Sequence, residues 1–199
     1  MSKKRGEKYD QIIDAAVKVI AENGYHHSQV SKIAREAGVA DGTIYLYFKN
    51  KEDILISMFE EKMGRFVEKI QERLNGVENT EEKMRILIEM HFSQLEHDHD
   101  MAIVTQLELR QSNIAIRHKV NEVLKGYLTL VDELLQEGIE TGFFDPQMDR
   151  RIARQMIFGA LDEIVTNWVM KDHRYELTPL VPTVNEMLLN GISCKQKTS

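Results

Sequence analysis

Side chains able to contact nucleic acid gather in one short stretch, residues 29–51. Gly42 and Thr43 stand at the exposed start of an expected short helix, from which a side chain can reach base edges in the major groove. The hydroxyls of Tyr45 and Tyr47 suit phosphate oxygens, and we expect Tyr47 to be half buried. The full set of expected DNA contacts is Gln29, Ser31, Lys32, Gly42, Thr43, Ile44, Tyr45, Tyr47 and Lys51.

Lysines add a charge argument to this set. Lys51 falls in the first turn of an expected helix, where the helix dipole disfavours a cation. A bound phosphate would reverse that cost, because backbone N–H groups and the ammonium would converge on it. Lys32, Lys49 and the Lys3–Lys8 arm would add attraction that is independent of DNA sequence. Taken one at a time, the tyrosines are equally well explained as core residues and Lys51 as a solvated lysine.

Two short helices crossing over a tight turn would position these groups. Ala34 is small where the two helices must approach closely, and Gly38 lies in the turn, where a left-handed backbone costs glycine little. The residues expected to pack both helices onto the preceding one are Ile33, Ala37, Val39, Ile44 and Tyr47. The pattern as a whole predicts a DNA-binding helix-turn-helix.

A second polar set lies near the middle of the chain. Gln106, Arg110 and Asn113 stand at positions i, i+4 and i+7, close to one face of a helix, and Arg117 follows a turn later. Arg110 also shares an apolar stripe with Leu107, and a cation there needs an anionic partner. A bound anion would serve, and so would a carboxylate of the protein itself. The carboxylates considered are Glu108 of another subunit, Asp162 and Glu163.

Apolar residues on neighbouring helices would complete a ligand site. Met90, Leu107, Phe158 and Leu161 could line a sleeve for an alkyl chain. Residues of these types at helical spacing would also form an ordinary core. The sequence leaves both interpretations open.

Residues that would indicate catalysis are sparse, and we predict that the chain is not an enzyme. The best metal candidate is the run from His97 to Asp100, in which Glu96 and His99 form one Glu-x-x-His pair. A di-iron bundle needs two such pairs, and no second occurs. We interpret this run as a solvated break between helices. No Gly-x-Ser-x-Gly motif is present, and Cys194 has no neighbouring base.

Helix start and stop signals divide the chain into about nine helices and predict an all-α fold. Ser28, Asp41 and Asn50 are the expected N-terminal caps of the second to fourth helices, with Asp53 completing a capping box. The expected ranges are 7–23, 29–37, 41–48, 51–74, 80–97, 100–112, 114–141, 148–171 and 179–191. The first three form a helix-turn-helix head, and the others form a larger helical body.

Composition and charge agree with this division. The chain has 199 residues, with 42% hydrophobic and 29% charged residues, as in soluble globular proteins. Its net charge is −6, yet residues 1–50 hold 8 Lys and Arg against 6 Asp and Glu. Polyanions are therefore expected at the N-terminal end. A single cysteine and the lack of an apolar leader or membrane span favour a reduced, cytoplasmic protein.

The head resembles the TetR family of bacterial repressors. The similarity is carried by Ile33-Ala34, Gly38-Val39 and the stretch DGTIYLYFKNKED from Asp41 to Asp53. It implies a DNA-binding domain over residues 1–50 and a ligand-binding and dimerisation domain over residues 51–199. It also implies a dimer that binds double-stranded DNA at a palindromic operator.

Further segments are similar to one subgroup of this family, the repressors of fatty-acid degradation in Gram-positive bacteria. They are Asn23–His26, Ala40–Leu55, Ala102–Asn113, Arg154–Gly159, Asp162-Glu163 and Trp168. This resemblance implies repression of fatty-acid β-oxidation genes that long-chain acyl-CoA relieves. Acyl-CoA would act as an effector, with no cofactor and no metal, and its phosphates would supply the anionic partner of Arg110.

The last two helices are the expected dimer interface, because their apolar residues exceed what one small body needs to cover. Two copies would form a four-helix bundle. A two-fold dimer would then place its two recognition helices about 34–36 Å apart, or a multiple of that. Effector binding would tilt the fourth helix and change this spacing.

Two other functions remain open. One is a TetR-type repressor that responds to another lipophilic or drug-like effector, which shares every argument about the head. The other is an architectural DNA-binding protein without a ligand, for which the body is large and acidic. Ligand-sensitive release from DNA distinguishes the two.

Overall fold

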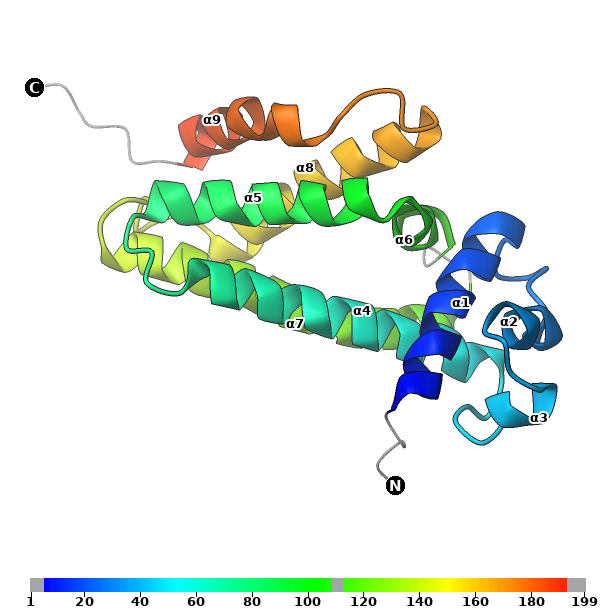
Figure 1. The fold of residues 1–199 in the computed structure, drawn as a ribbon. Coiled ribbons are helices and arrows are strands. Elements are labelled where there is room, and N and C mark those ends of the chain that lie inside the picture. The colour runs from blue at the N-terminus through cyan, green and yellow to red at the C-terminus, as the bar shows by residue number, and fades with distance from the viewer. Residues whose placement is uncertain (1–5, 109–112, 193–199) are drawn as a thin grey trace, which may run out of the picture. The chain divides into compact units, whose positions relative to one another are not determined.

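The computed structural model describes residues 6–108 and 113–192. Within them every regular element is helical, which confirms the predicted all-α class (Figure 1). The elements are α1 (Glu7–Asn23), α2 (Val30–Glu36), α3 (Asp41–Ile44), α4 (Lys51–Leu74), α5 (Thr80–His97), α6 (His99–Ile103), the π-helical segment η1 (Val104–Glu108), α7 (Ile114–Glu140), α8 (Arg150–Met170), the 3-10 turn η2 (Thr178–Leu180) and α9 (Val181–Ile192).

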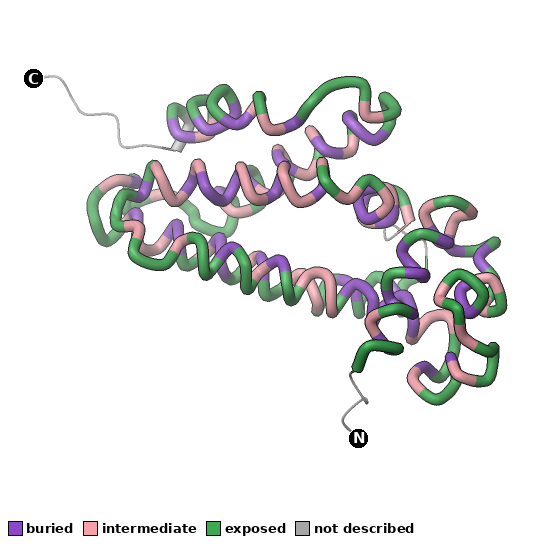
Figure 2. Tube along the Cα trace, in the orientation of Figure 1, coloured by how far each residue is buried: buried purple, intermediate pink, exposed green. Residues whose placement is uncertain are grey.

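The chain divides into two compact units. The first unit comprises Met1–Gly64 and Asp98–Val123, and the second comprises Arg65–His97 and Leu124–Ser199. In the first unit, α1 packs against α2, α6 and η1, and α2 packs against α3. Buried residues recur along α1 on more than one side, including Ile12, Ile13 and Ile20 (Figure 2). This helix therefore forms the core that carries the two short helices.

The second unit is built on α5, which packs against α8, α9 and η2. Its core contains Leu87 and Phe92 of α5, Tyr127 of α7 and Trp168 of α8. The indole N–H of Trp168 donates to the carbonyl of Tyr175, which fixes the chain after α8. None of the described helices is both long and apolar enough to cross a membrane.

Several helix ends follow the predicted signals. Gly24 ends α1 with φ of 75°, and the Asn50 side chain accepts the Asp53 N–H at 2.8 Å. The Asp53 carboxylate reaches the Lys49 N–H at 3.0 Å, so the cap differs in detail from the predicted capping box.

Two predicted caps are wrong. The hydroxyl of Ser28 donates to the carbonyls of Val19 and Gly24, because these two acceptors lie against it. The side chain of Asp41 makes no cap, since α3 begins at Asp41 itself after Ala40. The third helix is also shorter than predicted and ends at Ile44.

The predicted helix over 100–112 differs most from the structure. Asp98 caps α6 by accepting the Met101 N–H at 3.0 Å, so the helix begins at His99. After Ile103 the backbone widens into η1. The Thr105 hydroxyl donates to the carbonyls of Met101 and Ala102, a type of contact that bends helices. Residues 109–112 lie outside the described chain.

Candidate DNA-binding interface and effector site

The helix-turn-helix has most of the packing that its sequence predicts, although Ala37 and Val39 are only half buried. Ile33 and Ala34 of α2 and Ile44 of α3 have no exposed surface. Gly38 has φ of 65° in the turn. The Val39 N–H closes that turn on the Ala34 carbonyl at 2.9 Å. Together these contacts fix the direction in which α3 leaves the head.

The outer side of α2 and α3 is open to solvent. Gln29, Ser31 and Gly42 are exposed, Thr43 is partly exposed, and Tyr45 is 58% exposed. Ile44 is different: its buried side chain packs α3 onto the core and does not reach DNA, which corrects its place among the expected contacts.

Tyr47 is half buried, as predicted. Its ring lies 6.2 Å from that of Tyr9 on α1 and 6.4 Å from that of Phe48. Phe48 in turn stacks on Tyr9 at 5.2 Å. The ring of Tyr47 therefore anchors the end of the helix-turn-helix, and this is compatible with a hydroxyl at the surface.

Two of the predicted lysines, Lys32 and Lys51, already have partners within the protein. Lys32 donates to the side-chain oxygen of Asn23 at 2.9 Å. The Lys51 ammonium donates to the carbonyls of Tyr25 at 2.9 Å and His26 at 3.1 Å. It also lies 4.6 Å from the centre of the Tyr25 ring. Lys51 thus holds the loop between α1 and α2, a role that its sequence position did not reveal.

Two features of the first unit were not predicted from the sequence: the exposure of Leu46 and the contact of Glu108 with Tyr25. Leu46 is 80% exposed, immediately beyond α3, beside Tyr45. Glu108 accepts the Tyr25 N–H at 2.7 Å, although 83 residues separate them. Exposed apolar residues carry a weak sequence signal, and a contact so distant in sequence carries none.

The expected ligand residues fall in both units. Gln106, Leu107, Asn113 and Arg117 belong to the first, and Met90, Phe158 and Leu161 belong to the second. Gln106 and Leu161 are buried, whereas Leu107, Asn113 and Arg117 are exposed. The Asn113 side chain accepts the N–H groups of Ala115 and Ile116 and so caps α7. Arg110 lies outside the described residues.

An aromatic cluster in the second unit contains one of these residues. Phe158 meets the Tyr127 ring edge-on at 6.0 Å, and Phe66 stacks on the same ring at 5.8 Å. The hydroxyl of Tyr127 and Nδ1 of His91 are 3.0 Å apart. Burial raises the pKa of Tyr127, with a smaller contribution from Asp162.

His91 is the polar residue at the centre of this cluster. Its Nε2 is buried and has no hydrogen-bond partner among the residues that the structure describes. Burial lowers the pKa of His91 from 6.5 to about 4. The imidazole is therefore neutral near pH 7. A neutral side chain can line a site that binds uncharged groups.

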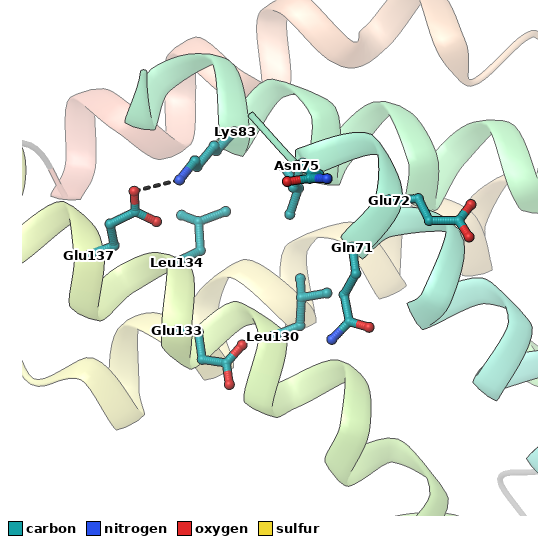
Figure 3. Close-up of a pocket in the computed structure, with 9 residues that line it drawn as sticks. Gln71, Glu72, Asn75, Lys83, Leu130, Glu133, Leu134 and Glu137 are labelled. Carbon is teal, nitrogen blue, oxygen red and sulfur yellow. Dashed lines mark hydrogen bonds and ion pairs between the residues drawn. The ribbon is translucent and has the colours of Figure 1, made fainter. Parts of the chain in front are cut away.

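A separate cleft of about 450 Å³ opens in the second unit (Figure 3). Its lining residues are Gln71, Glu72, Leu74, Asn75, Lys83, Leu130, Glu133, Leu134 and Glu137. Lys83 is paired with Glu137, so the lining is acidic. None of the expected ligand residues that the structure describes lines it. Its charge disfavours an anionic ligand.

The His97–Asp100 run has structural roles. Nδ1 of His97 lies 2.7 Å from the Ser93 carbonyl, and Asp98 caps α6. Across residues 6–108 and 113–192, no group of three or more His, Cys, Asp or Glu side chains is arranged to hold a metal ion.

Comparison with known proteins identifies relatives of both parts. Residues 12–58 match the family model "Bacterial regulatory proteins, tetR family". Residues 59–191 match "YsiA-like protein, C-terminal region". The chain is 60% identical over 193 residues to the "Fatty acid metabolism regulator protein" of Bacillus subtilis, covering 97% of this chain and 100% of that protein.

Solved structures agree with these matches. The fatty acid degradation regulator FadR of Bacillus halodurans is 68% identical, with a TM-score of 0.91 over 92% of this chain and 98% of that one. FadR of Bacillus subtilis in complex with stearoyl-CoA is 61% identical, with a TM-score of 0.90 over 92% of this chain and 99% of that one. The chain belongs to the TetR family of bacterial transcriptional regulators.

Proposed function

We propose that this protein represses fatty-acid β-oxidation genes, binds palindromic operators as a dimer, and is released by long-chain acyl-CoA. The observation that carries the proposal is the 60% identity to a fatty acid metabolism regulator over nearly the whole chain. The solved structure of FadR from Bacillus subtilis, to which this chain is 61% identical, is a complex with stearoyl-CoA. The protein would act in the cytoplasm, where operator and effector meet.

For DNA binding we assign residues 1–50 as the reading domain and residues 51–199 as the effector-binding and dimerisation domain. The exposed residues Gln29, Ser31, Gly42 and Thr43 supply groups for base edges and phosphates. The Tyr45 hydroxyl and the Lys51 ammonium supply phosphate contacts. Lys51 has three donors, two of which are used on the loop carbonyls, so one remains for a phosphate.

For the effector we assign Gln106, Arg110, Asn113 and Arg117 to the CoA moiety. Guanidinium groups bind phosphates through paired hydrogen bonds, which suits Arg110 and Arg117. The alkyl chain would lie along Leu107, Met90, Phe158 and Leu161. The aromatic cluster around Tyr127 supports this assignment, because Phe158 belongs to it.

For the dimer we assign α8 and α9 as the interface. Ile152, Met156 and Met170 are exposed on α8, at spacings that place them on one stripe of the helix. Met187 of α9 is 71% exposed. Contiguous exposed apolar side chains of this size mark surfaces that a partner covers.

The test is fluorescence anisotropy of labelled DNA from β-oxidation promoters and the protein's own promoter. Stearoyl-CoA is then added, with stearate and free CoA as controls. We expect release by stearoyl-CoA alone. If only another lipophilic compound releases the protein from DNA, that compound replaces acyl-CoA as the effector. DNA binding that is insensitive to every ligand would refute the regulatory proposal.

A variant locates the effector site. We expect Arg110→Ala to weaken the response to stearoyl-CoA while leaving DNA affinity nearly unchanged, because the side chain belongs to the effector set. If DNA affinity and the response to stearoyl-CoA fell equally, Arg110 would not belong to the effector set.

A further inference from the structure

The backbone of Tyr25 is held from two sides. Its N–H donates to Oε2 of Glu108 at 2.7 Å. Its carbonyl accepts the Lys51 ammonium at 2.9 Å, and the ammonium also lies 4.6 Å from the centre of the Tyr25 ring. Hydrogen bonds to charged groups are stronger than those between neutral groups. One residue of the loop between α1 and α2 is therefore fixed by η1 and by the start of α4.

Glu108 approaches this loop at a position that favours glycine. Gly24 has φ of 75°, a conformation that side-chain-bearing residues rarely adopt. A Cβ built at this position would lie 3.6 Å from Oε1 of Glu108, an ordinary van der Waals distance, so the carboxylate occupies the space beside Gly24. The carboxylate thus hydrogen-bonds to Tyr25 and faces the residue before it.

This loop determines where α2 begins. The Ser28 hydroxyl donates to the Gly24 carbonyl at 2.7 Å, and Lys32 reaches back to Asn23. Tyr25 itself is buried. Because α2 carries α3 through their shared packing, a shift of Tyr25 would move the helices that read DNA.

Glu108 is also the last residue of η1, which contains the proposed effector contacts Gln106 and Leu107. A π-helical turn holds one more residue than an α-helical turn, and such segments often occur at functional sites. If η1 returned to α-helical geometry, Glu108 would rotate around the helix axis by about one residue, roughly 100°. That rotation would withdraw its carboxylate from Tyr25.

We propose that Glu108 is a positioning residue that couples the effector-binding segment to the DNA-reading head. Its carboxylate holds Tyr25 in the DNA-binding arrangement, and effector contact with η1 withdraws it. The first part depends only on the contacts above. The second part rests on the proposed function, since it requires an effector at Gln106 and Leu107.

The first experiment compares Glu108→Ala and Glu108→Gln without effector. We expect Glu108→Ala to weaken operator binding about tenfold and to speed hydrogen exchange of the Tyr25 amide by a similar factor. Glu108→Gln keeps an acceptor oxygen, so its affinity should stay within about threefold of the wild type. The matched control is Glu60→Ala, an exposed glutamate on α4. Operator affinity and Tyr25 exchange in Glu108→Ala equal to those of the wild type would overturn the positioning role.

The second experiment measures exchange of the Tyr25 amide in the wild-type protein with and without stearoyl-CoA. We expect stearoyl-CoA to raise the exchange rate of the Tyr25 amide in the wild type to the rate found in Glu108→Ala without effector. In Glu108→Ala, stearoyl-CoA should not raise the exchange rate further. Release from DNA with unchanged Tyr25 exchange would overturn the coupling. Failure of stearoyl-CoA to release the wild type would instead refute the proposed effector, and the comparison of the two variants would still decide the positioning role. If Glu108→Ala does not fold, the wild-type measurement alone decides the coupling.

Discussion

A neutral histidine inside an aromatic cluster makes the stability of the second unit depend on pH. The pKa of His91 is about 4 in the folded protein and 6.5 when unfolded. Between these values the unfolded chain binds a proton that the folded chain does not, so stability falls as the pH decreases from 6.5 towards 4. We expect the free energy of unfolding to fall by about 2 kcal/mol between pH 7 and pH 5 because of His91. Denaturant titrations at both values, at one protein concentration, measure this.

The control for His91 separates it from the other titrating groups. His118→Gln replaces an exposed histidine and should keep the pH dependence of the wild type. His91→Leu should reduce the difference between pH 7 and pH 5 by about 2 kcal/mol, whatever its effect at pH 7. A difference as large as that of the wild type would show that His91 is not the source.

Lys51 combines two roles that salt dependence can distinguish. We expect Lys51→Ala to weaken DNA binding and to lower the slope of log affinity against log salt concentration by about 1, because one phosphate contact is lost. Anisotropy titrations at several salt concentrations measure the slope. Lys69→Ala removes an exposed lysine further along α4 and should change neither quantity. Weaker binding at an unchanged slope would leave Lys51 only its contacts with the loop carbonyls.

Helix α7 contains two glycines whose surroundings differ sharply. A Cβ at Gly138 would overlap the Phe144 ring and would lie 3.0 Å from Thr80 Cγ2. We expect Gly138→Ala to destabilise the protein by about 1–3 kcal/mol, because the ring must move within a packed core. Denaturant titration at pH 7 measures the change.

Gly126 is the matched control in the same helix. It is exposed, and nothing lies within 4 Å of a Cβ built there. Gly126→Ala should stabilise the protein by up to about 1 kcal/mol, since alanine favours helix more than glycine. Equal effects at the two positions would mean that helix propensity, and not contact with Phe144, determines them.

At the scale of elements, sequence predicted helices well where local residues specify their ends. Asn50 and Gly24 act within a few residues of themselves, and both were predicted. The contacts of Ser28 were not predicted, because its hydroxyl finds one acceptor on α1, the Val19 carbonyl, that only the folded chain brings near. The π-helical segment η1 was missed for a related reason, since apolar spacing predicts helix but not a change in the width of its turn.

At the scale of the whole molecule, the sequence predicted the reading head more completely than the effector site. The head is built from consecutive residues whose packing is local, so its buried and exposed positions could be read from spacing. The expected effector residues come from segments far apart in sequence, such as Met90 and Phe158. Helical periodicity identifies a face of each helix, but it carries no information on which other helix that face meets.

Dimer formation should be necessary for operator binding. We expect Met156→Glu to give a monomer in analytical ultracentrifugation, because it places a charge in the apolar stripe of α8, where Met156 is 57% exposed. A single head then binds only half of the operator, so affinity should fall by at least about a hundredfold. Thr129→Glu introduces the same charge at an exposed position of α7 and should leave both properties unchanged. A Met156→Glu dimer with full operator affinity would move the interface away from this stripe, whereas a monomer with full affinity would remove the need for a dimer.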